Sequence, residues 1–260
     1  MENNNKGLND SLENDTDEMS FTDKIIALFT EPFNLFESIK NYPPRNIDWL
    51  IPVFITIVIA IFSSMVQMND VEIKHEIREK QLQGLQKMVE EGKLPAESYD
   101  QAIERMGDAA KYQIFFTLIG VPIGVFFQFF VIALIYWVIA RLILRGDLVV
   151  YSHVLSVTGL ISIIGILSLI VTLALSILYG RMNTGLNLAL IAQPETKGPL
   201  LTLLKAIDPF TIWSLILTSI GLSKLTTTSF QKSVIAVFAF AVILLALSML
   251  MGQFFPSFGG

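Results

Sequence analysis

The stretch WLIPVFITIVIAIFSSMVQM, residues 49–68, contains no charged side chain in twenty positions. A helix rises about 1.5 Å per residue, so twenty apolar residues cross the roughly 30 Å of bilayer hydrocarbon. The whole chain shares this bias, because 53% of its 260 residues are hydrophobic, 16% are charged and its mean hydropathy is +0.60. Since a soluble domain of this length does not need so apolar a composition, we expect the excess to face lipid.

Further stretches of the chain are apolar enough to cross a membrane in the same way. An open sheet edge is not tolerated in hydrocarbon, and the chain has no alternating strand pattern, so these stretches are predicted to be helices. The predicted spans are 49–68, 114–140, 148–179, 207–222 and 233–255, of which the fourth is the shortest. The sequence therefore predicts an all-α integral membrane protein, a bundle of five transmembrane helices.

The segment before the first span divides into two parts. Residues 1–19 are rich in Asn, Asp and Glu, so we expect a disordered acidic tail. Ser20 and Asp23 then have the spacing of a capping box, and Pro32 starts a second short helix. Residues 20–47 are therefore predicted to be an amphipathic segment, lying either in the membrane interface or on the protein's own cytoplasmic loops.

Between the first two spans, residues 69–111 are polar but keep a helical period. Gly92 and Pro95 interrupt the pattern, which predicts a helical hairpin outside the membrane, inserted into a membrane domain of residues 48–255. Its apolar faces are expected to pair Ile73, Ile77, Leu85 and Val89 with Tyr99, Ile103 and Met106. We interpret the hairpin as a recognition module, with a structural brace as the alternative. A short tail, residues 256–260, ends the chain.

Charge outside the hairpin indicates an orientation. The first 48 residues hold ten acidic and four basic side chains, which excludes a nucleic-acid-binding arm. The positive-inside rule favours an N-terminus in the cytoplasm and a C-terminus outside. One side receives Lys24, Lys40, Arg45, Arg141, Arg145, Lys224 and Lys232, and the other receives Arg181, Lys197 and Lys205.

Residues suited to catalysis are few. Cysteine is absent, and the two histidines, His75 and His153, belong to no H-E-x-x-H motif. No G-x-S-x-G elbow and no phosphate-binding G-x-x-x-x-G-K-[ST] loop is present either. Glu90 and Glu91 precede Gly92 in the hairpin, away from any membrane histidine. We therefore expect no catalytic site, no metal and no cofactor.

Polar residues within the spans are also few. Asp48, Asp147 and Asp208 stand at span ends, where helix N-caps belong. Gln128 is the strongly polar side chain deep in the second span, and it predicts either an interhelical hydrogen bond or, less favoured, a substrate contact.

Small residues mark positions where helices can approach closely. Gly120 and Gly124 form a G-x-x-x-G pair around Pro122, which is expected to kink the second span, while Gly159 and Gly165 lie along the third. These positions favour packing within the bundle, with homodimerisation as the alternative; the oligomeric state stays open.

Three stretches together resemble a known family. They are Glu31-Pro32-Phe33-x-x-Phe36-Glu37-x-Ile39 before Pro43-Pro44, Gly146 through Gly159, and Asp208-Pro209-Phe210-x-Ile212-Trp213 through Gly221-Leu222 ahead of Lys224. Over roughly residues 31–255 the chain is similar to prokaryotic-type members of the Yip (Ypt-interacting protein) membrane family. The resemblance implies five transmembrane helices, a cytoplasmic N-terminus and, for a bacterial-type member, the inner membrane. Eukaryotic relatives are linked to Rab-type GTPases and to vesicle traffic.

These observations predict a non-enzymatic membrane protein that organises membrane or recruits partners through its N-terminal segment and its hairpin. Its expected partners are the lipid bilayer and an unidentified membrane or peripheral protein, without nucleic acid. The alternative is a small transporter or channel subunit, with Gln128, the kink at Pro122 and the segment 185–192 lining a path.

Overall fold

The structure, a computed structural model, describes residues 18–192 and 198–254, without the side chains of 106–111 and 251–254. The tails predicted for 1–19 and 256–260 therefore fall outside it, apart from Glu18 and Met19. All regular elements in the described ranges are helical. They are α2 (Phe21–Thr30), α3 (Pro32–Asn41), α4 (Ile47–Asn69), α5 (Val71–Glu90), η1 (Ala96–Ser98), α6 (Tyr99–Val138), η2 (Ile139–Ile143), α7 (Tyr151–Tyr179), η3 (Leu188–Ile191), α8 (Pro199–Ala206), α9 (Pro209–Thr226) and α10 (Phe230–Phe254).

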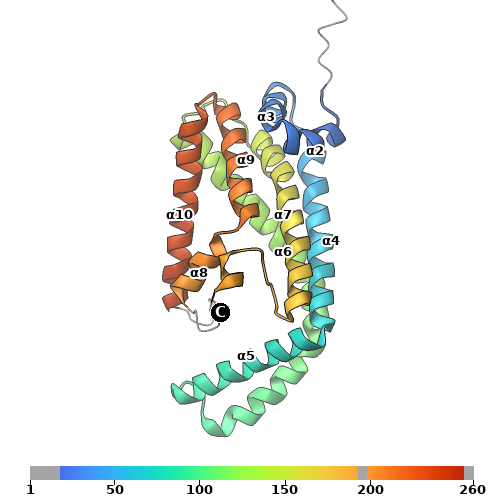
Figure 1. Cartoon of the computed structure of the whole chain (residues 1–260), viewed down its shortest axis with the longest axis vertical. Coiled ribbons are helices and arrows are strands. Elements are labelled where there is room, and N and C mark those ends of the chain that lie inside the picture. Colours follow the sequence, from blue (N-terminus) through green and yellow to red (C-terminus); the bar gives the residue numbers. More distant parts are fainter. Residues whose placement is uncertain (1–17, 193–197, 255–260) are drawn as a thin grey trace, which may run out of the picture.

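The long helices run along one axis and form a bundle (Figure 1). Stretches in α4, α6–η2, α7 and α10 are long and apolar enough to cross a membrane, and α8 with α9 adds a fifth crossing if the bent pair is one span. The predicted all-α membrane bundle is confirmed.

The fourth span differs from the single helix predicted for 207–222. It is broken, because α8 and α9 are bent by 61° at Ile207 and Asp208. The N–H of Leu188 donates to the carbonyl of Ile207 at 3.3 Å, which satisfies one backbone group freed by the break. The segment 185–192, which the transporter alternative expected to line a path, contains η3, and η3 packs on α8.

Helices α4 and α7 pack along each other, and α7 also contacts α9, which contacts α10. Gly159 makes the first of these contacts possible, since a Cβ at this position would overlap the backbone of Trp49 and lie 2.7 Å from the carbonyl oxygen of Asp48. The close approach predicted for Gly159 is present. A Cβ at Gly165, by contrast, would meet nothing within 4 Å, although close packing was expected there too.

Helix α6 joins the hairpin to the second span without interruption, and it passes through Pro122 as one helix of 40 residues. Much of its surface faces outward: Phe127 is 71% exposed and Ile123 is 64% exposed. A Cβ at Gly120 or Gly124 would also meet nothing within 4 Å. The predicted internal packing of the G-x-x-x-G pair is therefore wrong for the described chain, because this face of α6 contacts no other helix there.

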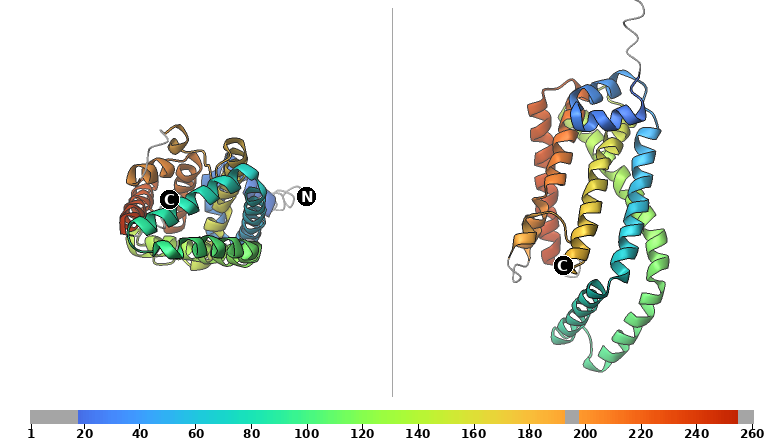
Figure 2. Two further views of the ribbon diagram at one scale, coloured as in Figure 1. Left: turned by 90° about the horizontal axis from the view of Figure 1, so that it is seen from below. Right: turned by 45° about the vertical axis from the view of Figure 1, so that its right-hand side comes forward.

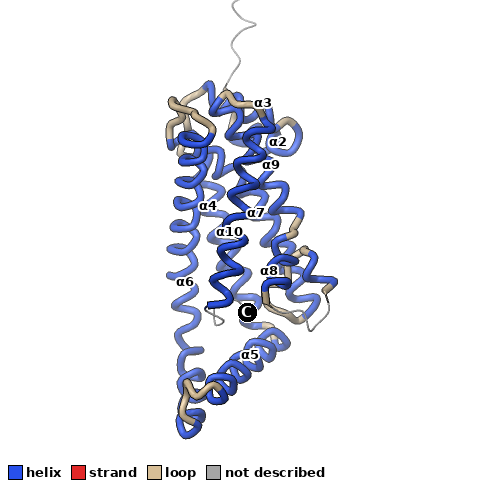
Figure 3. The backbone as a smooth tube through the Cα atoms, turned by 90° about the vertical axis from the view of Figure 1, so that its left-hand side faces the viewer, coloured by secondary structure: helices blue, strands red, loops and turns tan. Residues whose placement is uncertain are grey.

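The hairpin lies at the end of the bundle opposite to α2 and α3 (Figure 1). Helix α5 crosses beneath the bundle, and its far end meets the start of α6 through the Glu91–Ser98 connection (Figures 2 and 3). The base of the hairpin is held in place by Glu76, whose Oε2 accepts a hydrogen bond from the N–H of Met182 at 2.7 Å. Ile73 is fully buried, whereas Ile77, Leu85, Val89, Tyr99 and Ile103 are only partly buried. The predicted apolar pairing thus does not form a closed core among these residues, and the side chain of Met106 is not described.

Candidate interaction site at the cap end of the bundle

Helices α2 and α3, here called the cap, cover one end of the bundle, which we call the cap end. The predicted capping box starts the cap: the Ser20 hydroxyl accepts from the N–H of Asp23 at 3.2 Å and donates to its carboxylate at 2.6 Å. The inner face of the cap packs on α7 and α9 through one buried cluster. Its members are Ala27, Leu28, Leu35, Phe36, Ile39, Val157, Leu160, Ile161, Ile164, Leu217 and Ile220. The amphipathic segment therefore packs on the bundle itself rather than on its loops.

A buried ion pair joins the cap to the first span. Lys24 Nζ lies 2.9 Å from Asp48 Oδ2, and the two side chains are 3% and 1% exposed. Glu18 approaches Lys24 at 3.8 Å and Arg45 at 3.6 Å, which extends the network outward. Removal of one member of a buried pair leaves the other charge without compensation, so this contact fixes the cap to the bundle.

The position of Asp48 corrects its predicted role. Asp48 was expected to cap the first span, but it is the second residue of α4, and Asn46 occupies the N-cap position. Its carboxylate binds Lys24 instead of a backbone N–H. From the sequence, Asp48 had a local role as a helix cap and Lys24 indicated only the orientation, because the two residues are 24 positions apart and nothing in the sequence indicates their contact.

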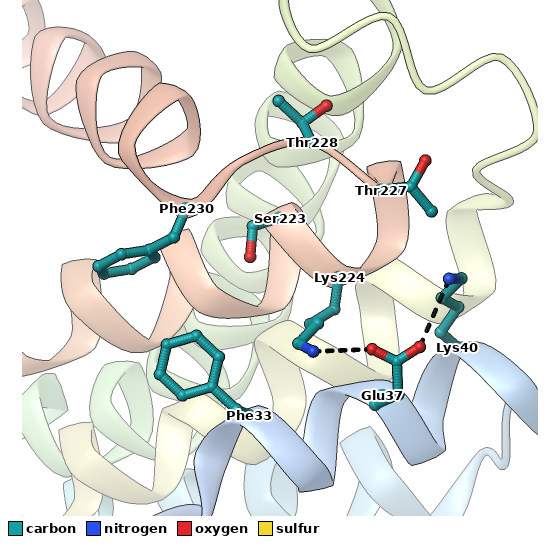
Figure 4. A pocket seen from close by; sticks show the side chains of 8 residues that line it. All are labelled: Phe33, Glu37, Lys40, Ser223, Lys224, Thr227, Thr228 and Phe230. Carbon is teal, nitrogen blue, oxygen red and sulfur yellow. Dashed lines mark hydrogen bonds and ion pairs between the residues drawn. The ribbon is translucent and has the colours of Figure 1, made fainter.

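A second ion pair joins the cap to the end of α9 (Figure 4). Glu37 accepts from Lys224 Nζ at 2.8 Å and lies 3.5 Å from Lys40 Nζ. The hydrogen bond and charge of Lys224 are the main reason that the pKa of Glu37 is lowered from its ordinary value. Beside this pair, the Phe33 ring contacts Phe230 edge to face at 5.7 Å (Figure 4).

These side chains line an open pocket of about 350 Å³, together with Ser223, Thr227 and Thr228. Glu37 neutralises much of the basic charge of Lys40 and Lys224 in the pocket. The pocket therefore offers hydroxyl groups and an aromatic edge more than net charge to a partner.

The residues of the family-like motifs meet at this interface. Phe36 of α3 is fully buried, and a Cβ at Gly221 of α9 would lie 2.6 Å from Val157 and 3.5 Å from the Phe36 ring. Trp213 contacts Phe29 of α2 edge to face at 5.3 Å. Two stretches that are far apart in sequence thus form one packing surface. The sequence contained both motifs but gave no signal that they touch.

Asp208 starts α9 as its position predicts. Its carboxylate accepts from the N–H of Phe210 at 2.9 Å and from the Thr211 hydroxyl at 3.2 Å, and Pro209 occupies the first helical turn. Phe210 is partly buried against the cluster under the cap.

Gln128 is exposed on α6. It does not line the pocket beside Glu37, and no hydrogen bond of its side chain is present in the described chain. The predicted interhelical hydrogen bond is therefore not formed within the monomer. Helix α6 is apolar on several sides, so the sequence could not indicate which side faces outward.

Groups suited to metal binding are not gathered in the described residues. No three His, Asp or Glu side chains lie close enough there to hold an ion. His75 Nδ1 lies 3.5 Å from Glu79 Oε1 on the exposed hairpin, and His153 lies half-buried in the first turn of α7. At the cap end, Lys24, Asp48, Glu37 and Lys224 are used in ion pairs, and Ser20 is used in a helix cap.

Comparison with known proteins agrees with this arrangement. A family model described as the Yip1 domain matches residues 26–251, a range that starts within α2 and includes α3, the hairpin and nearly all of the apolar helices of the bundle. No curated protein and no solved structure matches the chain. The match confirms the resemblance predicted from the motifs, and it covers most of the chain. This membrane protein therefore belongs to the Yip1 domain family.

Proposed function

We propose that the protein is a non-enzymatic membrane protein that recruits a protein partner to the cap end. The observation that carries this proposal is the way the cap is held. It is fixed to the bundle by the buried Lys24–Asp48 pair, while its outer side remains exposed. A fixed, exposed helical surface at the membrane boundary is preorganised for binding, because little ordering remains to be done when a partner arrives.

The outer side of the cap has two parts. Ile26, Phe29 and Phe33 are 56%, 41% and 44% exposed, and Phe29 and Phe33 contact the flanks of α9 and α10. This apolar part suits the headgroup region of a bilayer. Thr22 and Asn34 are also exposed, and such polar positions suit an aqueous partner.

The exposed position of Gln128 favours recruitment over transport. A transporter or channel subunit needs polar groups around a path, and Gln128 was the main candidate in the spans. Its side chain instead faces away from the bundle. The broken fourth span supplies one carboxylate, that of Asp208, and this group is used to start α9.

For the orientation, we propose that the cap end lies in the cytoplasm of a bacterial cell, at the inner membrane. Seven basic residues outside the hairpin belong to this end, which fits the positive-inside rule. Single cysteines at Thr22 and Gln83 should react with impermeant reagents from opposite sides. Labelling of both from one side would contradict the five-span arrangement.

The hairpin is the second surface that we propose for recognition. Beyond Glu76 its helices carry mostly exposed charges. Replacement of residues 81–105 by a short Gly-Ser bridge keeps the contact of Glu76 with Met182 and should leave membrane insertion intact. Loss of insertion would identify the hairpin as a brace.

The recruiting role can be tested by photo-crosslinking in native membranes. A photoreactive residue at Thr22 should give discrete protein adducts, whereas one at Phe127, which is 71% exposed on α6, should react with lipid. The Lys24→Met variant, in which the cap loses its ion pair, should lose the Thr22 adducts if it still inserts. Adducts at Thr22 with lipid alone would contradict the proposal.

A further inference from the structure

A second pocket at the cap end has a different chemistry from the one beside Glu37. It lies between the end of η2 and the start of α10, and its volume is about 430 Å³. Arg145, Thr228 and Lys232 give it a polar side. Ile143, Ile235 and Ala236 give it an apolar side.

Among the described residues, none of those that line this pocket is acidic. Arg145 and Lys232 are both exposed, and within the described residues neither forms an ion pair. In the first pocket, by contrast, Glu37 binds both cations. The second pocket therefore has two uncompensated positive charges, and the N-terminal end of the α10 dipole adds positive potential.

The backbone at Arg145 adds an independent observation. Its φ is +56°, a left-handed conformation that glycine or asparagine adopts with less strain than arginine. The turn is fixed by the N–H of Gly146, which donates to the carbonyl of Ala140 at 2.9 Å. A Cβ at Gly146 would lie 2.7 Å from Thr226 and 2.8 Å from Val149, so α9 holds the turn in place. An arginine kept in a strained position is an observation from which a functional role can be inferred.

The apolar side of the pocket selects the kind of anion. Ile143 and Ile235 are 59% and 69% exposed, and they belong to the helix ends that enter the membrane. A free inorganic anion gains nothing from these side chains. A phospholipid can place its phosphate at Arg145 and Lys232 and an acyl chain along the isoleucines.

We propose that this pocket binds the headgroup phosphate of an anionic phospholipid. Arg145 and Lys232 bind the phosphate, Thr228 lies beside it, and Ile143 and Ile235 contact an acyl chain. This inference does not depend on the recruiting role, because it concerns lipid and a different pocket.

The test uses the full-length protein in neutral detergent, titrated with phosphatidylglycerol, with phosphatidylcholine or with inorganic phosphate. Native mass spectrometry counts retained lipid, and thermal unfolding reports stabilisation. The Arg145→Asn/Lys232→Gln variant should bind phosphatidylglycerol about thirty-fold more weakly, since each basic residue near the surface contributes roughly 1 kcal/mol. The matched Arg181→Gln/Lys205→Gln variant at the other end should bind like the wild type.

The Arg145→Asn variant alone separates binding from folding. Asparagine tolerates the left-handed conformation, so this variant should unfold at the same or a higher temperature without lipid and still bind phosphatidylglycerol more weakly. Equal binding by the wild type and the double variant would overturn the proposal. Equal binding of phosphatidylcholine would do the same, and stabilisation by inorganic phosphate without any by phosphatidylglycerol would assign the site to a free anion.

Discussion

The cap end and the hairpin end use charge in different ways. At the cap end, Lys24 and Asp48 form an ion pair that is almost fully buried between two elements. In the hairpin, the ion pairs lie within one helix or one turn, as in Glu76–Lys80, and remain in contact with water. The same residue types therefore have different consequences. At the cap end they determine which helices pack together, and in the hairpin they mainly keep the surface soluble.

The largest effect is expected from Lys24→Met. The unpaired carboxylate of Asp48 would remain buried, which should lower the free energy of unfolding by about 3 to 5 kcal/mol. Thermal unfolding in detergent measures this loss. The Lys24→Met/Asp48→Leu variant removes both charges and should recover most of the stability. If the double variant is as unstable as the single one, lost packing rather than an uncompensated charge explains the effect.

Gly159→Ala tests the contact beside this pair. The added methyl group would meet the backbone of Trp49 and the carbonyl oxygen of Asp48, so α7 must move away from α4. We expect a loss of about 1 to 3 kcal/mol, as for other overpacked positions. Gly165→Ala, six residues further along the same helix, has open space and should be neutral or gain up to about 1 kcal/mol. Equal losses at the two positions would contradict the packing described here.

The sequence was informative wherever the deciding interaction is local. Ser20 and Asp208 were both expected to start helices, and both do so, because a cap and its N–H partner lie within a few residues. The apolar runs likewise predicted the crossing helices α4, α6, α7 and α10, because hydrophobic length is a local property of the chain, but they did not predict the break between α8 and α9.

The features that the sequence did not predict share one physical reason, because each of them depends on tertiary packing. Asp48 had a plausible local role as a helix cap, and Lys24 contributed only to the orientation, whereas in the fold the packing of the cap on the bundle brings them to 2.9 Å. Gly159 and Gly165 look alike in sequence, but only Gly159 faces the backbone of α4. Gln128 lies in a helix that is apolar on several sides, so no periodicity indicated its outward orientation. The contact of Phe36 with the region of Gly221 likewise required the fold.

Asp208→Ala should lower the stability less than Lys24→Met or Gly159→Ala. It removes the acceptor for the N–H of Phe210 and should cost about 0.5 to 2 kcal/mol in thermal unfolding. Asp208→Asn keeps a capping oxygen and should stay close to the wild type. A large loss in the Asn variant would show that the negative charge matters, and a loss of partner binding without any change in stability would show that Asp208 has a functional role.

The smallest effect is expected in the hairpin, from Lys80→Ala. Lys80 Nζ lies 3.0 Å from Glu76 Oε1, but the lysine side chain is 64% exposed and the two residues share one helix. Such a pair contributes about 0.3 to 0.5 kcal/mol, and added salt should remove most of it.

Glu76→Ala is the matched change on the other partner of Lys80, and it also removes the acceptor for the N–H of Met182. A bond of that kind contributes about 1 kcal/mol, so Glu76→Ala should cost more than Lys80→Ala and should keep its cost in high salt. Thermal unfolding of both variants at low and high salt makes the comparison. A loss for Lys80→Ala as large as that for Lys24→Met would mean that the hairpin charges also hold the fold together, and the contrast between the two ends would no longer stand.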